Sequence, residues 1–294
     1  MAIFEGAGVA IVTPFYKNGN INFEKLESYI DFQIANSTDA IIVCGTTGEA
    51  STMTDDEHLE CIKIAVSRTA GRVPVIAGTG SNDTRHGINL TKNAKALGVD
   101  ATLQVTPYYN KATQKGLIEH FKAIGNAVDL PMILYSVPSR TGVTITPQTV
   151  YELSKYDFVA GIKEATGNIS NVAEIAALCG TDFPIYSGND DQIIPILALG
   201  GKGVISVLSN VAPKETHDIV HLYLDGHTKE ALDIQLKLIP LVKALFCEVN
   251  PIPVKAALNL MNMEAGPCRL PLTNLESKNI SLLQNALTSC GLLA

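Results

Sequence analysis

Short apolar runs rich in β-branched residues recur along the chain. The runs are continuous rather than alternating, which is typical of parallel strands that are covered on both faces. Successive runs begin roughly 20–35 residues apart, the size of a strand–helix unit. The eight runs are GVAIVT (8–13), AIIVCG (40–45), VPVIAGT (73–79), ATLQVT (101–106), PMILYS (131–136), FVAGIK (158–163), FPIYSG (183–188) and KGVISV (202–207).

Helical patterns occupy several of the gaps between these runs. Residues 22–36 and 53–71 carry apolar residues at helical spacing, and the second segment opens with Thr54 as a candidate N-cap. Residues 84–98 and 170–180 end at a glycine, as helices often do. After the eighth run the chain is mostly helical, over residues 228–246, 251–261 and 274–287.

Eight strand–helix units in a row predict an α/β fold, a closed (β/α)8 TIM barrel with a C-terminal helical extension. We expect residues 1–210 to supply the barrel strands and crossover helices. Residues 211–294 would supply the last barrel helix and the extension, within the same compact unit. The alternative is an open Rossmann-type sheet, but no GxGxxG follows a predicted strand.

Composition and charge narrow the class of protein. The 294 residues are 46% hydrophobic and 17% charged, which fits a globular interior. A net charge of -7 without a basic cluster argues against nucleic acid as a partner. No apolar run approaches the roughly 18 residues of a membrane span, and the N-terminal stretch lacks the basic segment of a signal peptide. The six scattered cysteines form no CxxC pair, so we expect reduced thiols in a cytoplasmic protein with no membrane partner.

The polar residues that close each run are the candidates for chemistry, because active sites in this fold lie at the C-terminal ends of the strands. Hydroxyl and phenol groups dominate these positions, with one lysine, one arginine and no histidine. The lack of histidines there argues against a zinc or two-metal hydrolase. His217 and His221 are four residues apart but in no HExxH pattern, and we interpret them as a solvated helix face.

Lys163 closes the sixth run, where a charged amine would be costly to bury. Apolar surroundings disfavour the ammonium form, and a neutral amine can attack a ketone to form an imine without a metal or an organic cofactor. The alternative is a structural ion pair with a buried carboxylate, Glu164 or Asp190. The residues alone leave both interpretations open.

Seven segments of the chain match one known family in order and at fitting intervals. They are GTTGE (45–49), VTPYYNK (105–111), LYSVPSRTG (134–142), GIKEATGN (161–168), GVISVLSNVAP (203–213), NPIPVKAAL (250–258) and CRLPL (268–272). With these segments the chain resembles the dihydrodipicolinate synthase family, in the superfamily of pyruvate-dependent aldolases that includes N-acetylneuraminate lyase. The resemblance implies a lyase without a cofactor that condenses pyruvate with aspartate semialdehyde in diaminopimelate and lysine biosynthesis, assembled as a homo-oligomer, a dimer or tetramer.

The resemblance also implies catalytic roles. Lys163 would form the Schiff base with pyruvate, and Tyr135 would be the general acid and base beside it. Thr46 and Tyr109 would relay protons, with Tyr109 supplied across a subunit contact. The alternatives are that these tyrosines hydrogen-bond to the backbone and that Thr46 is a turn residue.

Four further residues would bind substrate in this family. Thr47 and the adjacent backbone amides would hold the pyruvate carboxylate, and Arg140 would bind the carboxylate of aspartate semialdehyde. Gly188 and Ile205 would line the pyruvate pocket. The alternatives are turn roles for Thr47 and Gly188 and a surface ion pair for Arg140.

The chain departs from the family in two places. Ser136 stands beside Tyr135 where an asparagine is usual. The pocket for inhibitory lysine in feedback-regulated members also changes, because His86 replaces a glutamate that would attract the ammonium of lysine. We therefore expect weak or no feedback by lysine. The positions that match this pocket are Ala50, Ser51, Asp55, His58, Asn82, His86 and Tyr108.

Two other functions remain as alternatives. The first is a related 2-keto acid aldolase, such as N-acetylneuraminate lyase or a 2-keto-3-deoxy sugar acid aldolase. Arg140 argues against this alternative, because an arginine suits a small acidic aldehyde better than a neutral amino sugar. The second is a catalytically silent barrel that binds a keto acid, and the presence of the lysine, the tyrosine and the arginine argues against it.

Overall fold

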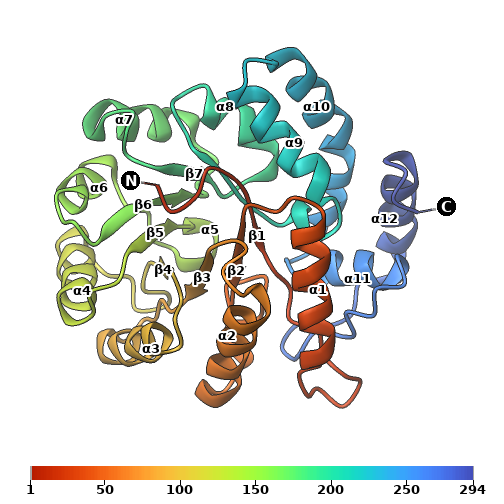
Figure 1. The fold of residues 1–294 in the computed structure, drawn as a ribbon, viewed down its shortest axis with the longest axis horizontal. Helices are drawn as coiled ribbons and strands as arrows, with labels where there is room; N and C mark the ends of the chain where they lie inside the picture. The colour runs from red at the N-terminus through yellow and green to blue at the C-terminus, as the bar shows by residue number, and fades with distance from the viewer. Residues whose placement is uncertain (1, 294) are drawn as a thin grey trace.

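The computed structural model describes residues 2–293, in which eight parallel strands close into a barrel in sequence order. Each strand pairs with the next along the chain, and β8 returns to β1. Figure 1 shows the ring of helices around these strands, so the predicted TIM barrel is confirmed. The strands are β1 (Gly6–Ala10), β2 (Ala40–Val43), β3 (Val75–Gly78), β4 (Ala101–Val105), β5 (Met132–Ser136), β6 (Val159–Glu164), β7 (Ile185–Ser187) and β8 (Gly203–Ser206).

Helices fill the gaps between strands and continue beyond β8. The predicted N-cap Thr54 is confirmed, because its side chain and that of Glu57 form a reciprocal capping box at the start of α2. The helices are α1 (Phe23–Ala35), α2 (Asp55–Thr69), α3 (Thr84–Ala96), α4 (Gln114–Ala127), α5 (Pro138–Thr141), α6 (Pro147–Ser154), α7 (Ile169–Cys179), α8 (Ile193–Leu197), α9 (Pro213–Leu224), α10 (Thr228–Leu245), α11 (Ile252–Leu260) and α12 (Ser277–Ser289), with 3-10 turns η1 (Ala50–Thr52), η2 (Asp190–Gln192) and η3 (Leu208–Asn210).

The first strand differs from the sequence prediction. It begins at Gly6, two residues before the apolar run, because Gly6 pairs with Gly203 on β8. A Cβ on Gly203 would lie 1.9 Å from the carbonyl oxygen of Gly6, so the two backbones come together only where a glycine stands. Glycine therefore permits the closure of the barrel at this point.

The barrel interior is packed with side chains from the strands and the adjoining segments. Successive residues of a strand point to opposite faces, so Lys163 faces the interior and Glu164 faces the helices. The phenol of Tyr186 stacks on Phe4 and donates to its carbonyl oxygen over 2.8 Å, within the core. The other interior residues are Ala10, Ala40, Ile42, Ile76, Ala101, Leu103, Ile133, Tyr135, Val137 and Ile205.

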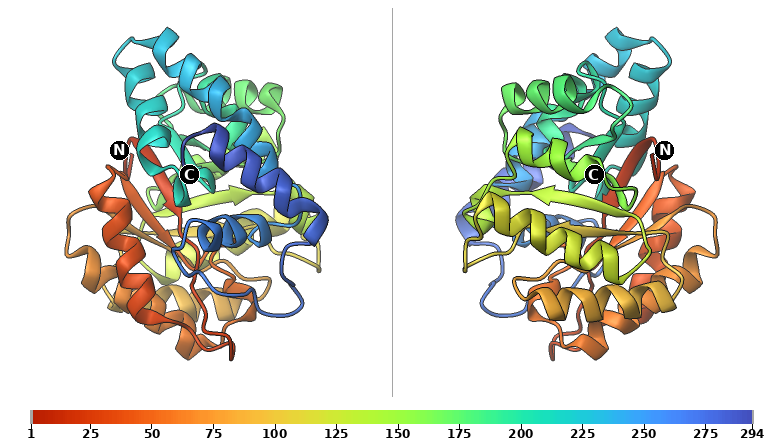
Figure 2. Two further views of the ribbon diagram at one scale, coloured as in Figure 1. Left: turned by 90° about the vertical axis from the view of Figure 1, so that its right-hand side faces the viewer. Right: turned by 90° about the vertical axis from the view of Figure 1, so that its left-hand side faces the viewer.

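The C-terminal extension packs against one side of the barrel. Helix α10 contacts α9 and α12, and Figure 2 shows α11 and α12 lying side by side on this flank. Of the helices within residues 2–293, none combines the length and apolar character that crossing a bilayer requires. All six cysteines are free thiols.

Candidate active site

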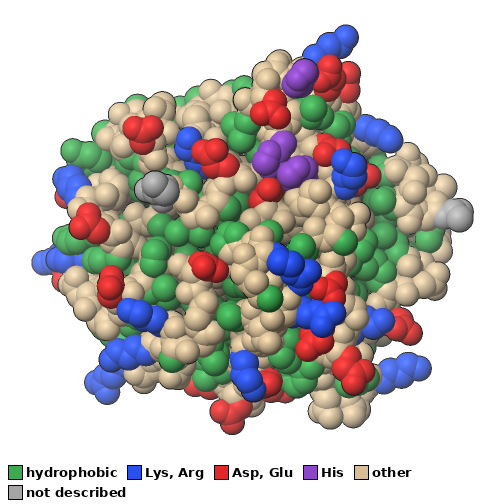
Figure 3. All heavy atoms as spheres, viewed as in Figure 1, with side chains coloured by type: hydrophobic (Ala, Val, Ile, Leu, Met, Phe, Trp, Pro, Cys, Tyr) green, Lys and Arg blue, Asp and Glu red, His purple; other side chains and the backbone are tan. Residues whose placement is uncertain are grey.

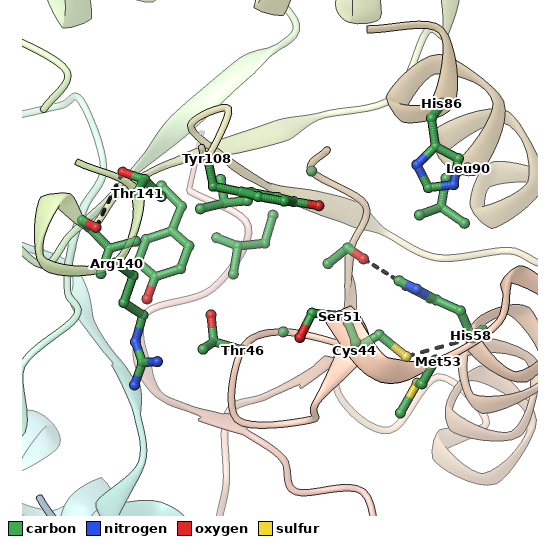
Figure 4. A pocket seen from close by; sticks show the side chains of 18 of the residues that line it. Cys44, Thr46, Ser51, Met53, His58, His86, Leu90, Tyr108, Arg140 and Thr141 are labelled. Atoms are coloured by element: carbon green, nitrogen blue, oxygen red, sulfur yellow. Dashed lines mark hydrogen bonds between the residues drawn. The ribbon is translucent and has the colours of Figure 1, made fainter. Parts of the chain in front are cut away.

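A cavity of about 400 Å³ opens among the loops that follow β2, β3, β4 and β5. These loops lie at the C-terminal ends of the strands, where the fold places its chemistry. Thr46, Tyr135 and Arg140 line the cavity, as do Tyr108 and His58. Figure 4 shows Arg140 and Thr46 toward one end of this space, His58 and His86 toward the other, and Tyr108 between them.

Lys163 lies at the end of β6 next to Tyr135, a cavity-lining residue. The two residues are register partners on adjacent strands, which places both side chains on the interior face. The Lys163 ammonium nitrogen lies 4.5 Å from the centroid of the Tyr135 ring. Lys163 is only 6% exposed, and no group in residues 2–293 forms a hydrogen bond or ion pair with its Nζ atom.

The structural ion pair considered for Lys163 is not formed. The Glu164 carboxylate accepts hydrogen bonds from the amide and hydroxyl of Thr166, at 2.8 and 3.0 Å. Asp190 Oδ2 accepts from two backbone amides after β8. Burial raises the pKa of Asp190, and the positive charge of Lys163 acts in the opposite direction. The Lys163 amine is thus close enough to the Asp190 carboxylate to influence its pKa but forms no ion pair with it.

The loop after β2 presents Thr46 and Thr47 beside the cavity. Cys44 and Glu49 have positive φ angles of 56°, and these two left-handed residues bracket the tight turn. In the described part of the chain, the backbone amides of Thr46 and Thr47 donate to no acceptor. Free amides of successive residues in such a turn form a site for an anion, and a carboxylate group fits it.

Asn250 joins this turn to Arg140 and was not assigned a role from the sequence. Its Nδ2 atom donates to Thr47 Oγ1 over 3.0 Å, and its backbone carbonyl accepts from Arg140 over 3.1 Å. The remaining side-chain oxygen is buried and has no partner within residues 2–293. The segment NPIPVKAAL contained Asn250, but nothing in the sequence placed it between two loops some 110 and 200 residues away.

Tyr109 does not reach the cavity of its own chain. Its side chain is 92% exposed, and its φ angle of 72° lies in the left-handed region that a bulky residue seldom adopts. The neighbouring Tyr108 lines the cavity instead. The proposed contribution of Tyr109 across a subunit contact stays a prediction.

Gly188 and Ile205 are not among the residues that line the cavity. Ile205 is fully buried in the interior core with Tyr135. A Cβ on Gly188 would lie 2.5 Å from Ala165 Cβ, so a glycine is needed for the close approach of β6 and β7. Packing against Ala165 therefore accounts for the glycine at position 188. The turn role of Gly188 and a direct contact of either residue with substrate stay predictions.

Most positions that match the inhibitor pocket line the same cavity. His86 Nε2 lies 3.0 Å from an Asp55 carboxylate oxygen, and its Nδ1 lies 3.1 Å from the Ser81 hydroxyl. His58 bonds to the carbonyl of Gly78, and burial lowers the pKa of His58. Asn82 is the exception, since it is outside the cavity lining and donates to the Tyr108 carbonyl.

The interpretation of His217 and His221 as a solvated face is wrong. Both side chains are partly buried, and both bond to Asp39, at 3.0 and 3.1 Å. Asp39 precedes β2 and is about 180 residues from α9, so no local pattern could reveal the contact.

Comparison with known proteins places the whole chain in one family. The model of the dihydrodipicolinate synthetase family matches residues 3–290. A 4-hydroxy-tetrahydrodipicolinate synthase from Caldicellulosiruptor saccharolyticus is 59% identical over 292 residues, 99% of each chain.

Solved structures agree with this assignment. Dihydrodipicolinate synthase from Thermotoga maritima is 44% identical with a TM-score of 0.96, covering 99% of this chain and all of the other. The enzyme from Cyanidioschyzon merolae, solved with lysine bound, is 42% identical with a TM-score of 0.97 over both full chains. This chain therefore belongs to the dihydrodipicolinate synthetase family and is a lyase of the class I aldolase type.

Proposed function

We propose that Lys163 carries the 4-hydroxy-tetrahydrodipicolinate synthase activity of this chain by forming a Schiff base with pyruvate. The supporting observation is the Lys163 amine itself, which is buried, unpaired within residues 2–293, and adjacent to Tyr135 at the wall of the cavity. An amine held in this way is available as a nucleophile because no carboxylate has to release it first.

The condensation follows from this amine. Lys163 Nζ adds to the keto carbon of pyruvate, and loss of water leaves an imine. The imine then gives up a proton from the pyruvate methyl group and becomes an enamine, whose carbon attacks the aldehyde of aspartate semialdehyde. The position of Tyr135 next to Lys163 at the cavity wall supports a role for its phenol in giving and taking these protons.

The two substrates each carry a carboxylate, and two different groups of the cavity would bind them. The turn at Thr46 and Thr47, with its free amides, suits the carboxylate of pyruvate. Arg140 also lines the cavity, and its guanidinium suits the carboxylate of the aldehyde substrate. Asn250 bonds to both Thr47 and Arg140, which holds the two binding groups at a fixed spacing.

Regulation by lysine is proposed to be weak or absent. The relative from Cyanidioschyzon merolae was solved with lysine bound. Here His86 occupies one matching position, supplies no negative charge, and occupies an oxygen of the Asp55 carboxylate that could otherwise bind an ammonium group.

Trapping the imine tests the function. The protein is incubated with pyruvate and borohydride, and peptide mapping locates the added mass. We expect the reduced adduct on Lys163 and no adduct in the Lys163→Ala variant. An adduct on another lysine, or none at all, would refute the proposal. Turnover of aspartate semialdehyde, compared with sugar aldehydes, then checks the acceptor.

A further inference from the structure

Three side chains meet at the opposite end of the barrel from Lys163. His217 and His221 are four residues apart on α9 and therefore share one face of the helix. Their rings stack with centroids 3.9 Å apart and planes at 26°. Asp39 directly precedes β2. Its Oδ2 atom lies 3.0 Å from His217 Nδ1, and its Oδ1 atom lies 3.1 Å from His221 Nε2. The space-filling view shows histidines gathered beside acidic groups on this face (Figure 3).

A glycine beside Asp39 leaves room next to the carboxylate and the His221 ring. Asp39 Oδ2 also accepts the amide proton of Ala7 over 2.7 Å, which fixes the carboxylate against β1. A Cβ on Gly6 would lie 2.1 Å from Asp39 Oδ2 and 2.8 Å from His221 Nε2. Gly6 has a φ angle of 125°, a conformation that other residues rarely adopt. The missing side chain at residue 6 leaves room beside two of the three polar groups.

We propose that Asp39, His217 and His221 bind a divalent transition-metal ion. The three ligand atoms lie within 4.8 Å of one another. Two imidazoles and a carboxylate form a donor set that suits zinc, copper and nickel. Bonds of about 2.0–2.2 Å in a tetrahedral site require ligand atoms about 3.3 Å apart. His217 Nδ1 lies 3.0 Å from one Asp39 oxygen and His221 Nε2 lies 3.1 Å from the other, so each imidazole is near this spacing. To bind one ion, the rings would turn so that both nitrogens point at it.

The ion would be structural rather than catalytic. The three side chains remain 18–38% exposed, so water can complete the coordination. The site fastens α9 to the segments that begin β1 and β2, at the N-terminal face of the barrel, where residues serve stability. It is independent of the Schiff-base chemistry proposed for Lys163.

Zinc titration of the tag-free, chelator-stripped full-length protein tests this site. Binding is measured by competition with a chromophoric zinc chelator. We expect the wild-type chain to bind one zinc ion per chain at this site, with an affinity at least ten-fold higher than that of the His221→Ala and His217→Ala variants. The wild-type thermal midpoint should rise with zinc concentration, because an ion that binds only the folded state stabilises it, and the rise should be lost in both variants.

The matched control is His227→Ala. The His227 imidazole lies 3.0 Å from the carboxylate of Glu230. The variant therefore removes a histidine–carboxylate pair that contains only one imidazole. This variant should bind zinc as the wild type does. Equal zinc affinity in the wild type and both α9 variants, or no saturable binding by the wild type, would show that the three side chains form only a hydrogen-bonded cluster.

Discussion

The ammonium of Lys255 lies 2.8 Å from a carboxylate oxygen of Glu49, and both side chains are almost fully excluded from solvent. Lys255 comes from α11, and it also donates to the backbone carbonyls of Thr13 and Pro267. The second oxygen of Glu49 accepts from the amide of Arg269. Glu49 ends the turn that holds Thr46 and Thr47, so this pair connects the C-terminal extension to the proposed pyruvate site.

Replacing Lys255 by methionine leaves the Glu49 carboxylate buried without its counter-charge. Breaking one side of a buried pair typically costs about 3–5 kcal/mol. We expect the free energy of unfolding of Lys255→Met to fall by about this amount in urea denaturation, and the KM for pyruvate to rise. The double variant Lys255→Met with Glu49→Gln should recover part of the loss. An unchanged urea midpoint in the single variant would contradict this account.

Arg140 is expected to act on the aldehyde substrate alone. Loss of a hydrogen bond to a charged group costs about 1.5–3 kcal/mol, so Arg140→Ala should lower kcat/KM for aspartate semialdehyde about 10- to 100-fold. Trapping of pyruvate on Lys163 should be unchanged. Arg85→Ala, which removes an exposed arginine outside the cavity lining, is the control. Equal loss of pyruvate trapping would show that Arg140 serves the first substrate instead.

Tyr109 is expected to complete the active site of a second copy of the chain. Coexpression of Lys163→Ala with Tyr109→Phe tests this, because a mixed assembly then contains one site with both an intact lysine and an intact tyrosine. We expect the mixture to be more active than either variant alone, by steady-state assay. If Tyr109 acted in its own chain, no site would be restored and the mixture would gain nothing.

Lysine is expected to inhibit this enzyme weakly or not at all. Substituting His86 by glutamate places a second carboxylate beside Asp55, and the added negative charge should attract the ammonium of lysine. We expect lysine to inhibit His86→Glu at lower concentration than it inhibits the wild type. His86→Gln, which adds no charge, is the control. Sub-millimolar inhibition of the wild type would overturn the prediction.

The contribution of His120 to the stability of the protein should fall on mild acidification. Burial lowers the pKa of His120, and Nε2 of its ring has no hydrogen-bond partner within residues 2–293. The unfolded chain takes up a proton near the ordinary histidine pKa of 6.5, whereas the folded chain does so only at lower pH. The free energy of unfolding therefore decreases as the pH falls through 6.5 toward the lower folded value.

The variant His120→Gln measures this contribution. The drop in thermal midpoint between about pH 7.5 and about pH 5.5 should be smaller in the variant than in the wild type. The glutamine is polar enough to keep a hydrogen bond to Thr84, which the histidine contacts at 3.0 Å. Identical drops in both proteins would assign the acid sensitivity to other groups, of which the buried His58 is the first candidate.

The order of strands and helices could be predicted because the signals are local. A parallel strand covered on both faces is a continuous apolar run, and eight such runs at regular intervals permit few arrangements. The helices α4 and α6 were not identified from the pattern. The start of β1 was also placed late, because the pairing of Gly6 with Gly203 is a contact between distant residues.

Part of the candidate site could be predicted in the same way. Lys163, Tyr135, Thr46 and Arg140 each follow an apolar run, and the fold brings strand ends together. The role of Asn250 could not be predicted. Asn250 belongs to the C-terminal extension and reaches the site through a contact with Thr47, which is 203 residues away in the sequence.

The barrel, the family resemblance and the candidate nucleophile Lys163 could all be predicted from the sequence, because each depends on residue type and on spacing within a few tens of residues. Which charges are paired follows from the folded structure and not from the sequence pattern. The folded structure left Lys163 without a partner in residues 2–293, paired Lys255 with Glu49, and brought Asp39 to His217 and His221. Such pairs join residues that are about 180 to 210 positions apart, and their distances are set by how the closed barrel and its extension pack.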